Sequence, residues 1–204
     1  MVKTRIAVFV SGGGTNLQAL IDAQAEGKLP SGEIALVLSS KAGVYALERA
    51  AAAGIPAVVV SRKEAGSQEA FEAGVLSALE EYGVEMIVLA GFLSILSEDF
   101  TRRYADRILN VHPSLIPAFC GKGYYGLKVH EEALAKGVKV TGATVHLVNE
   151  IPDGGRILLQ KAVEVEEGDT PEVLQRRVME QAEWILLPRA TQMVAHSIAM
   201  EKEN

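Results

Sequence analysis

The segment RILNVH, residues 107–112, ends with an amide and an imidazole two positions apart, and Pro113 follows it. In a strand, residues i and i+2 point to the same face, so Asn110 and His112 share a face with Ile108. An amide donor beside an imidazole can stabilise a developing oxyanion. A histidine on an otherwise apolar face is also often a packed core residue, so the pair is a candidate catalytic set with that alternative open.

The segment SGGGTNLQAL, residues 11–20, offers a second site because it leaves an apolar run and enters a helix. Glycines allow a tight turn, and free N–H groups at a helix start favour an anion such as phosphate. The hydroxyl of Thr15 and the amide of Asn16 add donors beside Gly14. Leu17 replaces the third glycine of the dinucleotide pattern, and no Lys-Ser or Lys-Thr follows the glycines, so neither common nucleotide fingerprint fits. A tight turn without a ligand stays the alternative.

Carboxylates occur at two further places that could serve chemistry. Asp153 in NEIPDGG precedes two glycines, and Glu150 lies in the same segment, where solvated turn carboxylates are common. Glu180 and Glu183 are three residues apart, which predicts that they face roughly the same side of the last helix. A solvated acidic face is their default, but a carboxylate near a ligand crevice could accept hydrogen bonds from sugar hydroxyls.

The remaining histidines and the one cysteine carry weaker signals. His146 lies in a predicted strand two residues after Thr144, where it is either core or a support for the site. His130 and His196 are predicted on helix surfaces, without chemistry. Cys120 has no base suggested nearby, so we expect no catalytic thiol.

The elements that must position these residues alternate between strands and helices. Apolar runs of strand length occur at 5–10, 33–39, 56–60, 85–90 and 107–112. Helical segments are predicted at 16–26, 43–53, 67–82 and 97–104, with Thr15, Ser67 and Ser97 as their caps. This alternation predicts an α/β, Rossmann-like fold with a mostly parallel sheet and helices on both faces.

After residue 112 the pattern changes. A short helix is predicted near 128–136, and two antiparallel strands at 140–148 and 156–165 are joined by a turn-rich loop. A final helix is predicted to start near Pro171. Ligands of open α/β sheets lie outside the carboxyl ends of the strands, so we expect the glycine segment and the Asn110–His112 pair to face one crevice.

Composition bounds the class of protein. The 204 residues are predicted to form one domain, 1–204, with a phosphate-binding half at 1–105 and a second half at 106–204. The net charge of −6 and the absence of a basic run argue against nucleic-acid binding. No apolar stretch approaches the ~20 residues that span a bilayer, and no signal-peptide pattern opens the chain, so we expect a cytoplasmic protein away from membranes.

Taken together, the segments SGGGTNLQAL, AGFLSILS, NVHPSLIPAF, GATVHLV and DGGRILLQ resemble the folate-dependent phosphoribosylglycinamide formyltransferases. The resemblance runs over roughly residues 4–190. It implies transfer of the formyl group of 10-formyltetrahydrofolate, a co-substrate, to the amino group of glycinamide ribonucleotide, without a metal, by a monomer or homodimer. It places the catalytic roles on Asn110, His112 and Asp153.

The resemblance also implies binding roles. The substrate phosphate falls to Gly14, Thr15 and Asn16, and the ribose hydroxyls to Glu183, with Glu180 beside it. The resemblance implies that the folate contacts a further set of residues: Gln68, Leu93, Ser94, Ile95, Leu96, Asn110, Asn149, Glu150, Ile151, Pro152 and Asp153. Gln68 and Ser94 stand where members of the family often carry basic residues, and the loop FCGKGYYGLKVH is longer than is usual there.

Rival interpretations remain at this level. Methionyl-tRNA formyltransferase and formyltetrahydrofolate hydrolase share the Asn-x-His-Pro-Ser segment, but an additional domain is expected in both. A nucleotide-binding module without catalysis would explain the glycine segment but would leave Asn110, His112 and Asp153 without a role.

Overall fold

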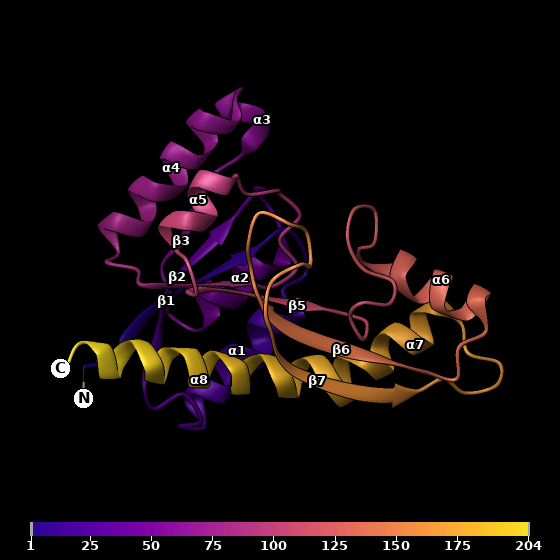
Figure 1. Ribbon diagram of the computed structural model, residues 1–204. Coiled ribbons are helices and arrows are strands. Elements are labelled where there is room, and N and C mark those ends of the chain that lie inside the picture. Colours follow the sequence, from indigo (N-terminus) through magenta and orange to yellow (C-terminus); the bar gives the residue numbers. More distant parts are fainter. Residues whose placement is uncertain (1, 204) are drawn as a thin grey trace.

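A computed structural model describes residues 2–203 and contains one seven-stranded sheet with the order β3-β2-β1-β4-β5-β6-β7 (Figure 1). The strands are β1 (Thr4–Val10), β2 (Gly32–Ser39), β3 (Ala57–Val59), β4 (Met86–Leu89), β5 (Ile108–His112), β6 (Val140–Leu147) and β7 (Ile157–Glu164). Neighbouring strands from β3 to β5 pair parallel, whereas β6 pairs antiparallel with both β5 and β7. The predicted mostly parallel sheet with antiparallel C-terminal strands is confirmed.

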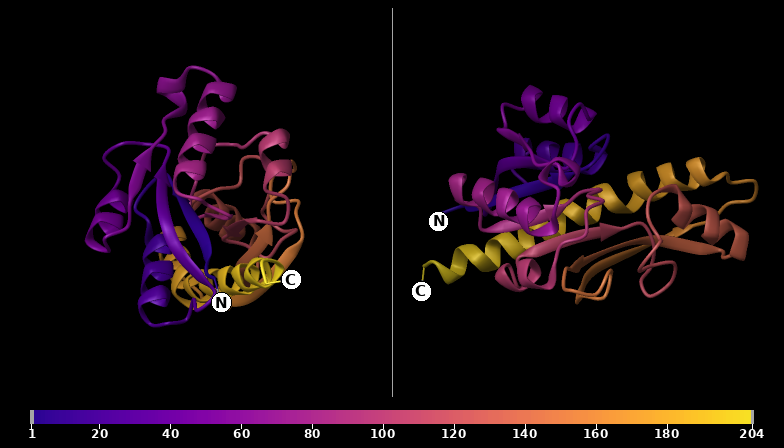
Figure 2. Two further views of the ribbon diagram at one scale, coloured as in Figure 1. Left: turned by 90° about the vertical axis from the view of Figure 1, so that its left-hand side faces the viewer. Right: turned by 90° about the horizontal axis from the view of Figure 1, so that it is seen from above.

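Helices cover both faces of the sheet, as the sequence predicts. They are α1 (Thr15–Ala25), α2 (Tyr45–Ala52), α3 (Arg62–Ala65), α4 (Gln68–Glu81), α5 (Glu98–Arg103), α6 (Leu127–Lys136), α7 (Pro171–Val178), the π-helical turn η1 (Met179–Glu183) and α8 (Trp184–Glu201). One core cluster joins α1 and α8 to the sheet, and a second joins α4 and α5 to it. Figure 2 shows α8 along one side of the strands and α4 with α5 on the other.

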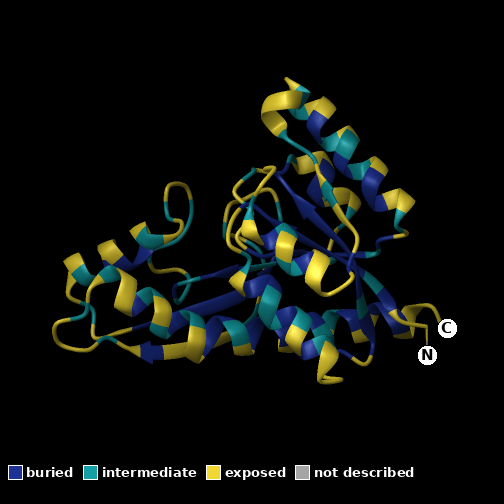
Figure 3. Ribbon diagram, turned by 180° about the vertical axis from the view of Figure 1, so that it is seen from behind, coloured by how far each residue is buried: buried dark blue, intermediate teal, exposed yellow. Residues whose placement is uncertain are grey.

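The parallel strands β1, β2, β4 and β5 are buried on both faces, which explains their continuous apolar sequences. All four residues of β4 are buried, and β1 has six buried residues of seven. In Figure 3 these central strands are almost entirely dark blue, whereas exposed residues lie on the outer sides of the helices. Parallel pairing of β1 with β4 and of β4 with β5 places the carboxyl ends of these three strands at one edge of the sheet.

Two of the three predicted helix caps are confirmed. The hydroxyl of Ser67 accepts the Ala70 N–H, and that of Ser97 accepts the Phe100 N–H. Thr15 is wrong as a cap, because α1 begins at Thr15 itself and its N-cap is Gly14, which has no side chain to offer. The short helix α3 after β3 is not predicted by the sequence pattern.

The final helix begins at Pro171 as predicted, with the Thr170 hydroxyl as its cap, but it is not continuous. The π turn Met179–Glu183 inserts extra backbone between α7 and α8. As a result Glu183 is buried, whereas Glu180 is exposed and pairs with Arg176 at 2.8 Å. The prediction that the two glutamates share one side of the helix is therefore wrong.

Of the two histidines outside the strands, one lies on the surface as predicted and the other is buried. His196 is exposed, as expected, and its Nδ1 lies 3.3 Å from the hydroxyl of Ser31. His130 on α6 is fully buried, and neither ring nitrogen has a hydrogen-bond partner among residues 2–203. The prediction of a surface position is wrong for His130 because its side chain lies on the apolar side of α6, with Val129 and Ala133.

Within the described residues, no helix has both the length and the apolar character needed to cross a membrane.

Candidate active site

Strand β5 carries Asn110 and His112 at its carboxyl end, where the sequence places them. Antiparallel pairing sets Asn110 opposite His146 and His112 opposite Thr144 on β6. His112 is 4% exposed, and its Nε2 donates to the Phe119 carbonyl at 2.8 Å. Its Nδ1 lies 3.5 Å from Oδ2 of Asp153. The loop after β6 thus brings the predicted carboxylate to the predicted imidazole.

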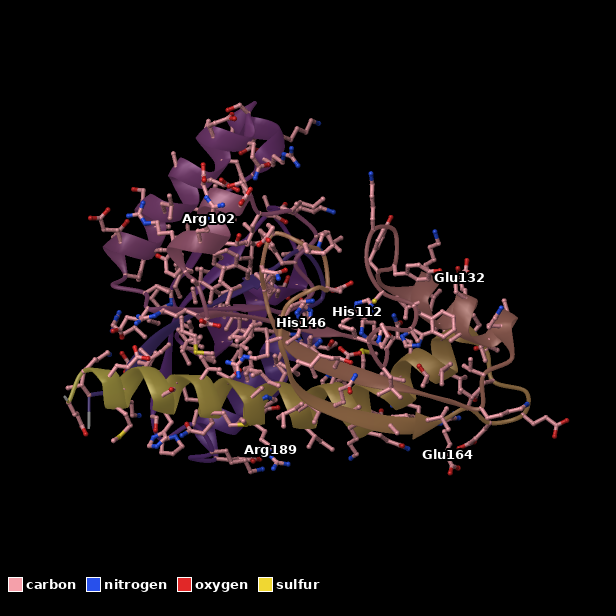
Figure 4. All side chains as sticks on the ribbon, viewed as in Figure 1. Arg102, His112, Glu132, His146, Glu164 and Arg189 are labelled. Atoms are coloured by element: carbon pink, nitrogen blue, oxygen red, sulfur yellow. The ribbon has the colours of Figure 1, made fainter. Side chains whose placement is uncertain are left out.

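His146 joins this cluster from the carboxyl end of β6, where the sequence left open whether it is core or a support for the site. Its Nδ1 donates to the Leu147 carbonyl at 2.8 Å, which leaves Nε2 as the nitrogen that faces the site. Nε2 lies 3.2 Å from Nδ2 of Asn110 and 3.4 Å from Oδ1 of Asp153. His146 is 2% exposed, so it supports both polar neighbours from inside the protein. Figure 4 labels His112 and His146 close together at the centre of the molecule.

The Asp153 loop is shaped by its glycines. Asp153 itself adopts a left-handed conformation with φ of 56°. A side chain at Gly155 would bring a Cβ to 1.8 Å from the Leu147 carbonyl oxygen, so only glycine permits this close approach to β6. The loop carboxylate also accepts the Gly121 N–H at 2.8 Å. The sequence Asp-Gly-Gly is therefore explained by the backbone path that delivers the carboxylate.

The charges of the cluster follow from burial and from these contacts. Burial alone would raise the pKa of Asp153, but His146, His112 and the Gly121 N–H together lower it, so the group is a carboxylate at neutral pH. Burial lowers the pKa of His112, although Asp153 and the Phe119 carbonyl act to raise it. Asp153 therefore favours the charged form of His112, but without ligands it does not outweigh burial, and a charged imidazole is not favoured.

An apolar cavity of about 160 Å³ adjoins the cluster. Asn110, His146 and Asp153 of the cluster line it. Eight of the residues expected to contact folate line it beside Asn110: Ser94, Ile95, Leu96, Asn149, Glu150, Ile151, Pro152 and Asp153. Leu93 and Gln68 do not line it. The Leu93 side chain is 56% exposed, and the Gln68 amide donates to Glu72 and to the Ile95 carbonyl.

The glycine segment lies at the carboxyl end of β1 and meets the π turn. Gly14 has φ of 71°, and a Cβ there would lie 2.7 Å from that of Ala46, so glycine is needed for two reasons. The Asn16 amide donates to Glu183 at 2.7 Å across 167 positions of sequence. Burial raises the pKa of Glu183 to about 7, partly offset by this hydrogen bond. The predicted phosphate segment and the predicted ribose carboxylate are thus in direct contact.

Other predicted residues of this region lie apart. The Thr15 hydroxyl points to the sulfur of Met179 at 3.7 Å, and Glu180 is on the surface. The glycine segment does not line the cavity beside Asn110, although Ser11 at its start accepts the Leu93 N–H at 3.0 Å.

Burial and Asp153 raise the pKa of Cys120, which makes it a poor nucleophile. Among residues 2–203, no three side chains of the His, Cys, Asp or Glu type are grouped to hold a metal ion.

Comparison with known proteins assigns the family. The sequence model described as "Formyl transferase" matches residues 4–191, almost the whole chain. The chain belongs to the formyl transferase family. It is 43% identical over 177 residues to the phosphoribosylglycinamide formyltransferase of Haemophilus influenzae, covering 87% of this chain and 81% of that protein.

Two further relatives extend the comparison. The glycinamide ribonucleotide transformylase 1 of Symbiobacterium toebii has a crystal structure that matches with a TM-score of 0.89 at 42% identity, over 96% of this chain and 89% of that one. The trifunctional purine biosynthetic protein adenosine-3 of Gallus gallus is 48% identical over 195 residues, which are 95% of this chain but 18% of that protein. The chain therefore spans between 14% and 19% of the length of the trifunctional relatives it matches.

Proposed function

We propose that this chain is a folate-dependent phosphoribosylglycinamide formyltransferase, which moves a formyl group from 10-formyltetrahydrofolate to the amino group of glycinamide ribonucleotide in purine synthesis. The names of the Haemophilus and Symbiobacterium relatives support this substrate pair. The observation that carries the proposal is the cluster of Asn110, His112, His146 and Asp153, which three contacts of 3.2–3.5 Å link into a chain beside an apolar cavity. That arrangement suits addition to a carbonyl carbon without a metal.

The cavity fits one flat ring system of a folate. Its walls include Leu89, Phe92, Leu96 and Val148, and its volume of about 160 Å³ is below the ~300–1,000 Å³ of typical ligand cavities. It would therefore hold the folate ring system, while the rest of the molecule lies outside. The folate supplies the activated formyl group when bound. Ser94 and Ile95 at the rim would meet the part that leaves the cavity.

The chemical step is proposed to begin with attack of the amine nitrogen on the formyl carbon. A carbon–nitrogen bond forms, and the π electrons of the carbonyl move to its oxygen. Asn110 donates an amide N–H to this oxyanion. His112 supplies the second donor, which requires the Phe119 carbonyl to release the Nε2 hydrogen that it accepts in the ligand-free chain.

Asp153 is proposed to move the proton. Its lowered pKa keeps it ionised, so it can accept a proton from the attacking amine, directly or through water. The oxyanion pair of electrons then restores the carbonyl, the bond to the folate nitrogen breaks, and the same proton goes to that nitrogen. A proton on Nδ1 of His112 during the step would turn the 3.5 Å approach to Asp153 into an ion pair.

Phosphate and ribose recognition remain predictions that the geometry supports. The left-handed Gly14 exposes the backbone N–H groups at the start of α1, which suit a phosphate. Glu183 would accept from ribose hydroxyls, and its contact with Asn16 ties it to that phosphate segment. A division of residues 1–204 into a phosphate-binding half and a catalytic half, a monomeric or dimeric state, and a cytoplasmic location likewise stay predictions.

A formyl-transfer assay with the purified chain tests the proposal. The unaltered chain is expected to convert glycinamide ribonucleotide and 10-formyltetrahydrofolate, and Asn110→Ala to lower turnover by about 10²- to 10³-fold with little change in substrate dissociation constants. Asp153→Asn should lower turnover steeply, whereas the matched control Asp99→Asn on the exposed side of α5 should not. Near-normal turnover in a folded Asp153→Asn chain would contradict the mechanism. Release of formate without an amine acceptor would point instead to a hydrolase.

A further inference from the structure

A second cavity lies away from the catalytic cluster, between α1 and α8. Its volume is about 600 Å³, within the range of cavities that hold small organic ligands. The cavity adjoining the catalytic cluster, at about 160 Å³, shares no lining residue with it. Thr15, at the start of α1, reaches its edge from the glycine segment. None of the proposed catalytic steps uses this space.

One wall of the cavity is apolar and partly aromatic. Trp184, Ile185 and Pro188 of α8 face Ala19 and Ala23 of α1 across it. Ile185 is 49% exposed although most apolar side chains of α8 are buried. The two alanines leave the space open, because a larger side chain at either position would occupy it. A flat ring can therefore lie against the indole and the proline.

The rim of the cavity carries cations that are not neutralised by contact. Arg49 donates to the Gly13 carbonyl and to the Gln18 side chain, both at 2.9 Å, and lies 4.8 Å from the ring centre of Tyr45. These neutral partners hold the guanidinium in place without compensating its charge. The side chain of Arg189, which lines the same cavity from α8, forms no ion pair or hydrogen bond within residues 2–203.

The other charged groups at the rim are partly matched. Lys28 pairs with Glu26, and Asp22 accepts a hydrogen bond from Gln18. Two arginines, Arg49 and Arg189, therefore line the cavity together with one unpaired carboxylate, Asp22. The excess of positive charge favours an anion near the arginines. Figure 4 shows Arg189 below α8, on the side away from the labelled His112 and His146.

We propose that this cavity is a binding site for a nucleoside monophosphate, whose base lies on the Trp184–Pro188 wall and whose phosphate is held by Arg49 and Arg189. A nucleoside monophosphate combines the two features that the cavity presents, a flat apolar ring and a compact anion. Of the residues proposed to bind the ribonucleotide, only Thr15 lines this cavity, and the proposal does not rest on the proposed function.

The fluorescence of Trp184 provides a direct test, because it is the single tryptophan of the chain. The emission is expected to change on titration with AMP, and AMP should bind at least tenfold more tightly than adenosine or inorganic phosphate alone, since each of these has only one of the two features. Arg189→Gln should weaken AMP binding about tenfold or more with the melting temperature unchanged. Arg62→Gln, an exposed arginine on α3, is the matched control and should leave the affinity within twofold.

Competition separates this site from the proposed substrate site. An excess of glycinamide ribonucleotide should not displace AMP, and Arg189→Gln should leave formyl-transfer turnover without AMP unchanged. Equal AMP affinity in Arg189→Gln and in the unaltered chain would overturn the proposal. So would full displacement of AMP by glycinamide ribonucleotide, or no change in emission up to millimolar AMP. None of these results would bear on formyl transfer, which is measured separately.

Discussion

Replacement of Glu183 by glutamine should stabilise the protein above neutral pH. Glu183 is 6% exposed, and among residues 2–203 its carboxylate accepts a single hydrogen bond, from Asn16 at 2.7 Å. Burial raises its pKa to about 7 from the usual 4.5. The folded protein therefore keeps a proton that the unfolded chain releases between these two pH values. Glutamine has nearly the same shape and can accept the same hydrogen bond, but it carries no charge to bury.

The magnitude follows from the displacement of the pKa. The carboxyl costs nothing below pH 4.5, and the free energy of unfolding falls as the pH rises to about 7. A change of roughly 2.5 pKa units corresponds to about 3 kcal/mol at about 1.4 kcal/mol per unit. Glu183→Gln should match the unaltered chain near pH 4.5 and exceed it by about 3 kcal/mol at pH 8. For a chain of this size, that difference is a rise in melting temperature of roughly 10 °C.

Urea unfolding of both chains at several pH values between 4.5 and 8 measures this difference. Glu180→Gln is the control, because Glu180 is exposed and its pair with Arg176 is a surface ion pair of small energy. Its effect should stay within about 0.5 kcal/mol at every pH. A stability difference for Glu183→Gln that does not vary with pH would refute the assignment of a buried, proton-holding carboxyl.

Three further outcomes are expected. His130→Leu should flatten the acid loss of stability: burial lowers the pKa of His130 to about 4, so the unaltered chain should lose up to about 3 kcal/mol as the pH falls from 6.5 to 4, as urea unfolding would measure. His146→Gln should reduce kcat about tenfold with KM within twofold and shift the acid limb of the pH–rate profile, whereas His196→Gln should change neither. Ser97→Ala should cost about 1–2 kcal/mol in thermal unfolding, since its hydroxyl caps α5.

Much of the fold is readable from the sequence because its strands are buried on both faces. The apolar runs predicted at 5–10 and 85–90 correspond to β1 and β4, with ends that differ by one residue. The run at 56–60 shrinks to the three residues of β3, which lies at the edge of the sheet, where pairing on one side gives a weaker signal. The π turn Met179–Glu183 has no local sequence signal, since its residues are ordinary helix formers.

The site was predictable in part for similar reasons. Asn110 and His112 are two residues apart on one strand, so the strand period alone predicts that their side chains point to the same face. The approach of Asp153 needed the path of a loop, and the role of His146 needed the register between β5 and β6, which no local pattern fixes. The surface position predicted for His130 is wrong, although the sequence contains a pattern that indicates burial. Its spacings of three and four to Ala133 and Leu134 put it on the apolar side of α6.

The π turn Met179–Glu183 constrains the number of residues between α7 and α8. The π turn takes up about one residue more than a regular α-helical turn, so removal of one residue between Met179 and Ala182 would let this stretch continue as regular α-helix. The widened turn that sets the carboxyl of Glu183 against Asn16 would then be lost. A homologue with a one-residue gap in this stretch is therefore expected to lose the contact even if it keeps both residue types. The count of residues here is as much a part of the site as their identity.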